Sequence, residues 1–159
     1  MSDQVIHRAL YDSVNEVLEK MFFVQTMGES SIPGPGSDAQ LDEIAIRIAF
    51  QGEPSGALML RLTSAAARQI AADFLGIDEA EVSDLQTSEV VGELANMICG
   101  SLLSRMESAT TFHLEAPRMV APSEEPGGNN LAVELPNGRL IVKVAIETPT
   151  CLEPAQSAS

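Results

Sequence analysis

Aromatic residues are scarce in this chain of 159 residues, which has no tryptophan, one tyrosine and five phenylalanines. Apolar residues nevertheless make up 45% of the sequence. The core must therefore consist mainly of Leu, Ile, Val, Ala and Met, and the seven methionines add some packing latitude. A chain of this length is expected to form one domain that buries about two-thirds of its unfolded surface.

Basic residues are also few, with nine Lys and Arg against 23 Asp and Glu, for a net charge of −14. Such an excess of negative charge repels phosphate backbones, so nucleic-acid binding and docking on an anionic membrane are disfavoured. It does not exclude an acidic protein partner, because local charge pairs dominate within a Debye length of about 8–10 Å.

Disulfide, targeting and metal-binding patterns are missing as well. The two cysteines, Cys99 and Cys151, make no disulfide framework. The N-terminus lacks a signal-peptide pattern, and no apolar run approaches the roughly 18 residues of a membrane span. We therefore expect a cytoplasmic protein without a membrane segment. His7 and His113 are isolated, and neither His-x-x-x-His nor Cys-x-x-Cys occurs, so no metal site is expected.

Hydrophobic periodicity predicts helices over residues 3–25, 64–75 and 85–107. Alternating residues predict two hairpins, one with strands 43–51 and 57–62 and one turning at Asn137-Gly138 between strands 131–135 and 140–146. Residues 28–40 are predicted to form a loop. The proline-containing segment up to Pro122 is expected to run along a sheet edge.

This order of elements predicts an α+β domain, with a mostly antiparallel sheet of two hairpins plus an edge strand and with long helices on one face. The domain is expected to span residues 1–148. Residues 149–159, rich in Pro, Ala and Ser, are predicted to be a disordered tail.

The helix predicted at 85–107 has two different faces. At about 100° per residue, one face is an apolar stripe of Val90, Val91, Leu94, Ile98 and Leu102. The opposite face, which we call the polar ridge, consists of Glu89, Glu93, Asn96, Gly100 and Ser104. Asn and Gly are poor choices for the middle of a helix. The ridge is therefore a candidate site as well as the solvated side of an amphipathic helix.

The pattern Glu93-x-x-Asn96-x-x-x-Gly100, followed by Pro117, resembles the active-site helix of the CheC/CheX/FliY phosphatases of bacterial chemotaxis. The order of elements over residues 5 to 147 resembles the single-site, CheX-like branch. The resemblance implies a CheC-like/CheX-like fold with a pseudo-twofold arrangement. It also implies a homodimer that pairs through sheet edges.

The resemblance further implies a hydrolase that accelerates loss of the aspartyl phosphate from a CheY-type response regulator in two-component signalling. On this basis Asn96 orients the attacking water, Glu93 anchors the receiver lysine, and Gly100 admits the partner closely. Glu89 and Ser104 are expected partner contacts, although the family usually has Asp or Ser where Glu89 stands. The chain needs no cofactor of its own, because the receiver domain supplies Mg²⁺.

The first predicted helix carries Asp12 and Asn15 at the same spacing as Glu93 and Asn96. Two-site relatives have a second Glu-x-x-Asn on the corresponding helix. Here the acid is one methylene shorter, and Glu19 replaces the glycine one turn later. We interpret Asp12 and Asn15 as a degenerate second site.

Two alternatives stay open. One is a non-catalytic receiver-binding or flagellar-switch-like adaptor domain, which would have no need of an intact Glu93 and Asn96. The other is an independent hydrolase that uses Glu89 and Glu93 as an acid–base pair. The intact Glu-x-x-Asn pattern favours the phosphatase.

Overall fold

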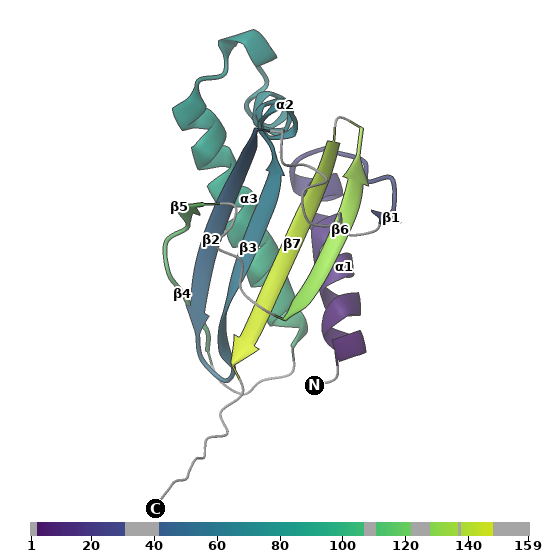
Figure 1. Cartoon of the computed structure of the whole chain (residues 1–159), viewed down its shortest axis with the longest axis vertical. Helices are drawn as coiled ribbons and strands as arrows, with labels where there is room; N and C mark the ends of the chain where they lie inside the picture. The colour runs from purple at the N-terminus through teal and green to yellow at the C-terminus, as the bar shows by residue number, and fades with distance from the viewer. Residues whose placement is uncertain (1–2, 31–41, 107–110, 122–127, 137, 148–159) are drawn as a thin grey trace, which may run out of the picture.

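The computed structural model describes residues 3–30, 42–106, 111–121, 128–136 and 138–147 (Figure 1). The helices are α1 (Asp3–Met21), α2 (Ser64–Leu75), the 3-10 turn η1 (Glu79–Glu81) and α3 (Asp84–Arg105). The strands are β1 (Glu29–Ser30), β2 (Glu43–Gln51), β3 (Ser55–Thr63), β4 (His113–Leu114), β5 (Arg118–Val120), β6 (Asn129–Leu135) and β7 (Gly138–Glu147). The predicted tail and most of the predicted loop at 28–40 lie outside the described residues, so the proposed domain limits stay a prediction.

The strands form one sheet in the order β1-β6-β7-β3-β2-β4, and β5 also pairs with β2. Every pairing is antiparallel. The three α-helices lie on one face of this sheet (Figure 1). The hairpins β2–β3 and β6–β7 meet through β3 and β7, with Met59 opposite Lys143. The predicted α+β class, the two hairpins and the single helical layer are therefore confirmed.

The hydrophobic core lies between the sheet and the helices. Its large, fully buried side chains are mostly aliphatic, as the composition requires: Leu10, Leu18, Ile48, Leu58, Leu60, Leu62, Leu94, Ile98 and Leu102, with Phe22 and Phe50. On the opposite face of the sheet, Ala45 and Met59 are also buried. Alternation predicted a half-buried strand there, because it reports the polarity of side chains and not what lies over a face.

Helix α1 is four residues shorter than the predicted 3–25. It ends because Phe23 adopts a left-handed conformation, with φ of 57°. The Val24 N–H then donates to the Leu18 carbonyl at 2.9 Å. Glycine usually occupies this position after a helix, so a phenylalanine there gave the sequence no stop signal.

Caps set the limits of α2 and α3. The Thr63 hydroxyl accepts from the Ala66 N–H at the start of α2, and Gly76, with φ of 71°, ends it. At the start of α3, the Ser83 hydroxyl accepts from the Gln86 N–H at 3.0 Å, and the Gln86 carboxamide accepts from the Ser83 N–H at 2.9 Å. This reciprocal pair holds the first turn, and it starts α3 within one residue of the prediction.

The edges of the sheet differ from the prediction in detail. Strands β4 and β5 both pair with β2, which confirms that the proline-containing segment runs along an edge. The short strand β1, within the predicted loop at 28–40, was not anticipated because two residues carry no periodicity. Leu135 pairs with Gly138, so Gly138 is already a strand residue. The turn predicted at Asn137-Gly138 is therefore misplaced by one residue, and Asn137 itself lies outside the described residues.

Candidate functional site

Helix α3 presents the polar ridge away from the core. The stripe predicted to be apolar is buried, with Leu94, Ile98 and Leu102 each at 0% exposure. The side chains of Glu89, Glu93, Asn96 and Ser104 are exposed, and Gly100 is half-buried. Burial of one face thus orients the whole ridge toward solvent, as the periodicity predicts.

Glu93 and Asn96 form no side-chain hydrogen bond or ion pair within the described part of the chain. The carboxamide keeps two donors and an acceptor for water or a partner. One turn further on, a Cβ added at Gly100 would meet nothing within 4 Å. The centre of the ridge therefore combines an available amide, an available carboxylate and a bare stretch of helix.

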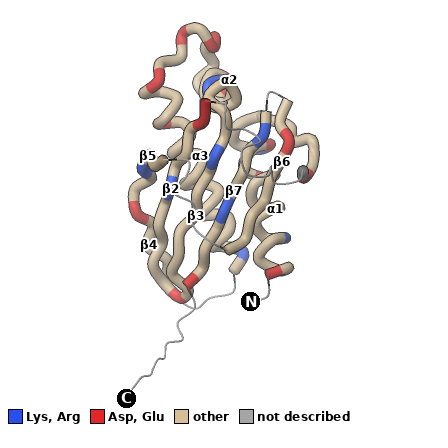
Figure 2. The backbone as a smooth tube through the Cα atoms, viewed as in Figure 1, with Lys and Arg blue, Asp and Glu red and all other residues tan. Residues whose placement is uncertain are grey.

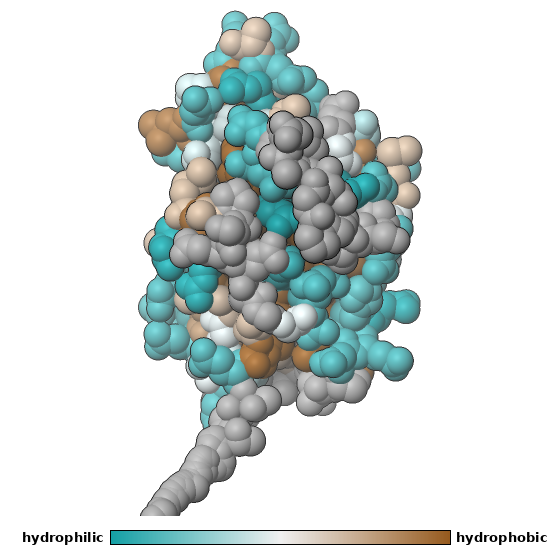
Figure 3. Space-filling view, viewed as in Figure 1, coloured by the Kyte–Doolittle hydropathy of each residue, from teal (hydrophilic) through white to brown (hydrophobic). Residues whose placement is uncertain are grey.

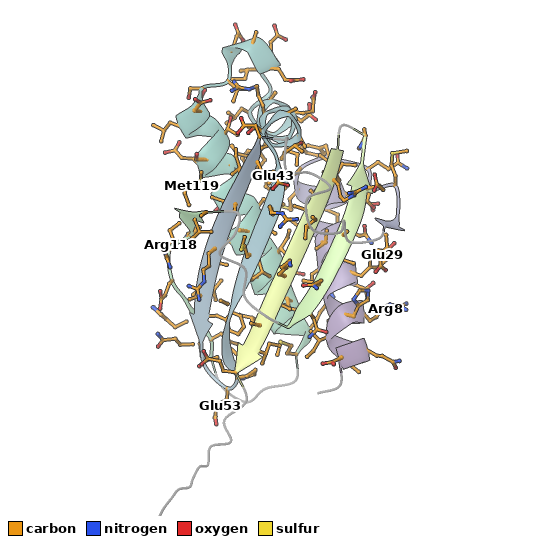
Figure 4. The ribbon with its side chains drawn as sticks, viewed as in Figure 1. Arg8, Glu29, Glu43, Glu53, Arg118 and Met119 are labelled. Atoms are coloured by element: carbon orange, nitrogen blue, oxygen red, sulfur yellow. The ribbon has the colours of Figure 1, made fainter. Side chains whose placement is uncertain are left out.

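A groove of about 430 Å³ lies beside Glu93. We call it the α3–β5 groove, and it is lined by Ile46, Ser88, Glu89, Gly92, Glu93, Pro117, Arg118 and Met119. Pro117 closes its base against Gly92, where an added Cβ would stand 3.5 Å from the proline ring. Figure 4 places Arg118 and Met119 on the β5 side of the molecule. The sequence does not predict this wall, because β5 and Pro117 come to lie beside α3 only through tertiary structure.

The predicted second site on α1 is engaged internally. The Thr26 hydroxyl donates to the Asn15 carboxamide oxygen at 2.5 Å. Asp12 lies 3.5 Å from the Arg8 guanidinium, one turn away on the same helix. Asp12 and Asn15 therefore have partners on α1 and in the segment after it, and among the described residues neither is bonded to a member of the ridge.

A polar network joins α1 to α3 beside the ridge. Arg105 donates to a Glu16 carboxylate oxygen at 3.0 Å, and the Ser101 hydroxyl donates to the same oxygen at 3.4 Å. The hydrogen bond from Arg105, followed by one from Lys20, lowers the pKa of Glu16. This network ties the two helices together next to Gly100.

Charge is distributed unevenly between the two layers. Of the nine Lys and Arg residues, those on strands are Arg47, Arg61, Arg118, Arg139 and Lys143 (Figure 2). Those on helices each lie within 4 Å of a carboxylate, in the pairs Arg8–Asp12, Lys20–Glu16, Arg68–Asp84 and Arg105–Glu16. Glu89 and Glu93 have no such pair among the described residues, so the ridge carries unneutralised negative charge.

Metal-binding and nucleophilic groups are not gathered at this site. Within the described ranges, no cluster of three or more His, Cys, Asp and Glu residues is arranged to hold a metal ion. His7 hydrogen-bonds Glu29 at 2.9 Å. Burial raises the pKa of the Cys99 thiol to about 12, which leaves it a protonated core group. No helix in these ranges is both long and apolar enough to cross a bilayer.

Comparison with known structures places the fold. CheX of the CheX-CheY-BeF3-Mg²⁺ complex from Borrelia burgdorferi is 20% identical, with a TM-score of 0.67 over 87% of this chain and 96% of that one. CheX from Vibrio vulnificus is 15% identical, with a TM-score of 0.69 over 89% and 96%. The FliM middle domain from Vibrio alginolyticus is 10% identical, with a TM-score of 0.53 over 89% and 91%. At these identities the likeness establishes the fold alone.

The family comparison is more specific. No curated protein sequence matches the chain. The family model described as chemotaxis phosphatase CheX matches residues 44–136, more than half of the chain. That span includes all of α3 and the β5 wall of the groove, and it excludes α1. The chain therefore belongs to the CheX family of chemotaxis phosphatases.

Proposed function

We propose that this protein accelerates hydrolysis of the aspartyl phosphate on a CheY-type receiver domain. Asn96 orients the attacking water, and Glu93 pairs with the active-site lysine of the receiver. Membership of the CheX family supports this proposal. A CheX with the same fold also forms a complex with CheY, BeF3 and Mg²⁺.

The observation that carries the proposal is the availability of Asn96. Its carboxamide is exposed and has no partner among the described side chains. An acyl phosphate is already reactive, so catalysis needs positioning and charge stabilisation more than a strong base. A carboxamide accepts from a water while donating to a phosphoryl oxygen, and it can therefore hold that water in line. In this proposal the receiver supplies Mg²⁺ and this chain supplies no cofactor.

The neighbours of Asn96 have supporting roles. Glu93, one turn back on the ridge, offers a carboxylate without a described cation. Pairing with the receiver lysine would set the register of the two proteins. The clearance at Gly100 would let the receiver backbone approach the helix. Glu89 and Ser104 extend the contact along the same line.

The setting of this activity is also proposed. We expect the protein to act in the cytoplasm, in chemotaxis or another two-component pathway. We also expect a homodimer that pairs through the sheet edges.

A receiver-binding adaptor without catalysis is the second candidate. The observation that favours it is the fold shared with the FliM middle domain. In that case the ridge would dock a receiver, but Asn96 would be dispensable for any chemistry.

The rate at which phosphorylated CheY-type receivers from the same cell lose their phosphate distinguishes a phosphatase from an adaptor. Asn96→Ala should slow the catalysed decay by roughly 10²–10³-fold, the scale of losing one preorganised polar group at a reacting centre. The free energy of unfolding should be unchanged or rise by up to about 0.7 kcal/mol, because Ala is the better helix former. Asn130→Ala, at an exposed asparagine on β6, is the matched control and should match wild type.

Two outcomes would contradict the proposal. If Asn96→Ala is as active as wild type, another group orients the water. If wild type binds a receiver but leaves its decay unchanged, the adaptor function is correct.

A further inference from the structure

We propose that the α3–β5 groove binds the segment of the receiver that carries its active-site lysine, and that Met119 and Glu89 select the receiver there. An apolar side chain beside the lysine packs on Met119, and a second basic side chain pairs with Glu89. This inference rests on the proposed function, because it takes the lysine to be at Glu93.

The groove is continuous with the site. Glu93 is both a member of the polar ridge and part of the groove wall. A chain that brings a lysine to Glu93 can therefore lay its neighbouring residues along the groove. Ile46 and Pro117 form apolar parts of the lining. The Met119 side chain lines the groove as well and is 51% exposed to solvent.

Met119 is one of several large apolar side chains that the described residues expose, as is Leu85 near the start of α3. Figure 3 shows hydrophobic surface on the α3 and β5 side of the molecule, among hydrophilic neighbours. Methionine adapts its shape to irregular partners, which suits a contact that discriminates between related receivers. Burial of Met119 by a partner would remove apolar area from water and stabilise the complex.

The negative charge of Glu89 and Glu93 favours a bound segment that carries basic side chains. Glu89 and Glu93 lie one turn apart, where like charges repel, and every helix-borne Lys and Arg already has another carboxylate. Arg118 lines the groove as well, but it forms no ion pair with either glutamate. Its Cα partner in the β2–β5 register is Arg47, which is also a cation. A segment with two basic groups would neutralise both glutamates.

A second copy of this chain is a poorer occupant. The chain has a net charge of −14, and its remaining cations are on strands, where Arg61 and Arg139 lie within 4 Å of Glu43 and Glu134. A receiver segment with an apolar residue next to its lysine meets both requirements of the groove.

The test is the affinity for CheY-type receivers of the same cell, activated with beryllofluoride, which stands in for the phosphoryl group. Met119→Gln should weaken binding about tenfold, equivalent to about 1.4 kcal/mol. Met119→Leu, which keeps the apolar contact, should bind like wild type. Met27→Gln is the matched control, because Met27 is also exposed but lies beside β6, toward the other edge of the sheet.

A second variant tests the charge. Glu89→Gln should weaken binding about two- to fivefold at low salt, the range of an exposed ion pair. The difference should vanish near 1 M salt, where the Debye length is about 3 Å. Met119→Gln should keep its full effect at that salt concentration.

The outcomes separate this inference from the proposed function. If Met119→Gln binds every receiver as tightly as wild type, or no receiver binds, the groove is not the docking site. The same conclusion follows if Met119→Gln changes only self-association in sedimentation. If Met119→Gln weakens binding but wild type never accelerates decay, the groove inference stands and the phosphatase proposal falls.

Discussion

Helices α1 and α3 both carry a carboxylate and a carboxamide three residues apart, and both pack on the same face of the sheet. They differ in what the amide contacts. Asn15 on α1 accepts a hydrogen bond from Thr26, whereas Asn96 on α3 has no partner among the described side chains. Glu19 follows Asn15 by one turn, where Gly100 follows Asn96.

The difference shows that spacing alone does not make a site. An amide that is already bonded within its own protein must lose that bond before it can hold a water. An amide on a bare helix surface pays no such cost, and a glycine one turn away leaves room for a partner. Availability and clearance therefore distinguish Asn96 from Asn15.

The largest expected effect is a catalytic contrast between the two amides. Asn96→Ala should lower the rate of receiver dephosphorylation by roughly 10²–10³-fold, and Asn15→Ala should change it by less than about twofold. Single-turnover decay of a phosphorylated receiver measures both. Similar losses in the two variants would mean that α1 holds a working second site.

The next largest effect is expected at Gly100, where the bare helix surface leaves room for the receiver. Gly100→Gln should raise the free energy of unfolding by roughly 0.5–1 kcal/mol, because glycine is a poor helix former. Activity should nevertheless fall on the order of 10- to 100-fold, as the receiver is displaced from Asn96. Glu19→Gln, at the matching turn of α1, is the control for urea unfolding and for decay assays. A Gly100→Gln protein with full activity would show that no partner approaches there.

The bond that occupies Asn15 should contribute measurably to stability. Thr26→Val keeps the shape and removes the donor to Asn15, so unfolding should become easier by about 0.5–1.5 kcal/mol. Thr111→Val, at an exposed threonine, should be near neutral. A neutral Thr26→Val in thermal and urea unfolding would mean that Asn15 is not held, and the contrast with Asn96 would weaken.

The smallest effect concerns the link between the helices. The hydrogen bond from Arg105 lowers the pKa of Glu16 below its ordinary value of 4.5. Ionised Glu16 therefore stabilises the folded protein fully above pH 4.5, and this stabilisation is lost as the pH falls through the lowered pKa. Wild type should be more stable than Glu16→Gln at about pH 6, and the gap should narrow by about pH 3 in urea titrations. A gap that is constant with pH would show that Glu16 does not titrate through this network.

Much of the fold was predictable because local signals agreed. Alternation predicted both hairpins, and the observed caps Thr63, Ser83 and Gly76 are of the residue types that favour the ends of helices. The 3.6-residue period placed Glu93 and Asn96 on the solvent side of α3. The end of α1 was not predictable, since Phe23 adopts a conformation that its side chain does not favour.

The candidate site also has features that follow from the sequence and features that only the tertiary structure determines. The residues on one helix face follow from sequence spacing, so the linear chain already specified the polar ridge and its resemblance to the CheX family. Three facts required tertiary structure: β5 faces α3 across a groove, Thr26 engages Asn15, and Arg105 of α3 pairs with Glu16 of α1. Each depends on chain segments that are distant in sequence, and periodicity cannot report which of them meet.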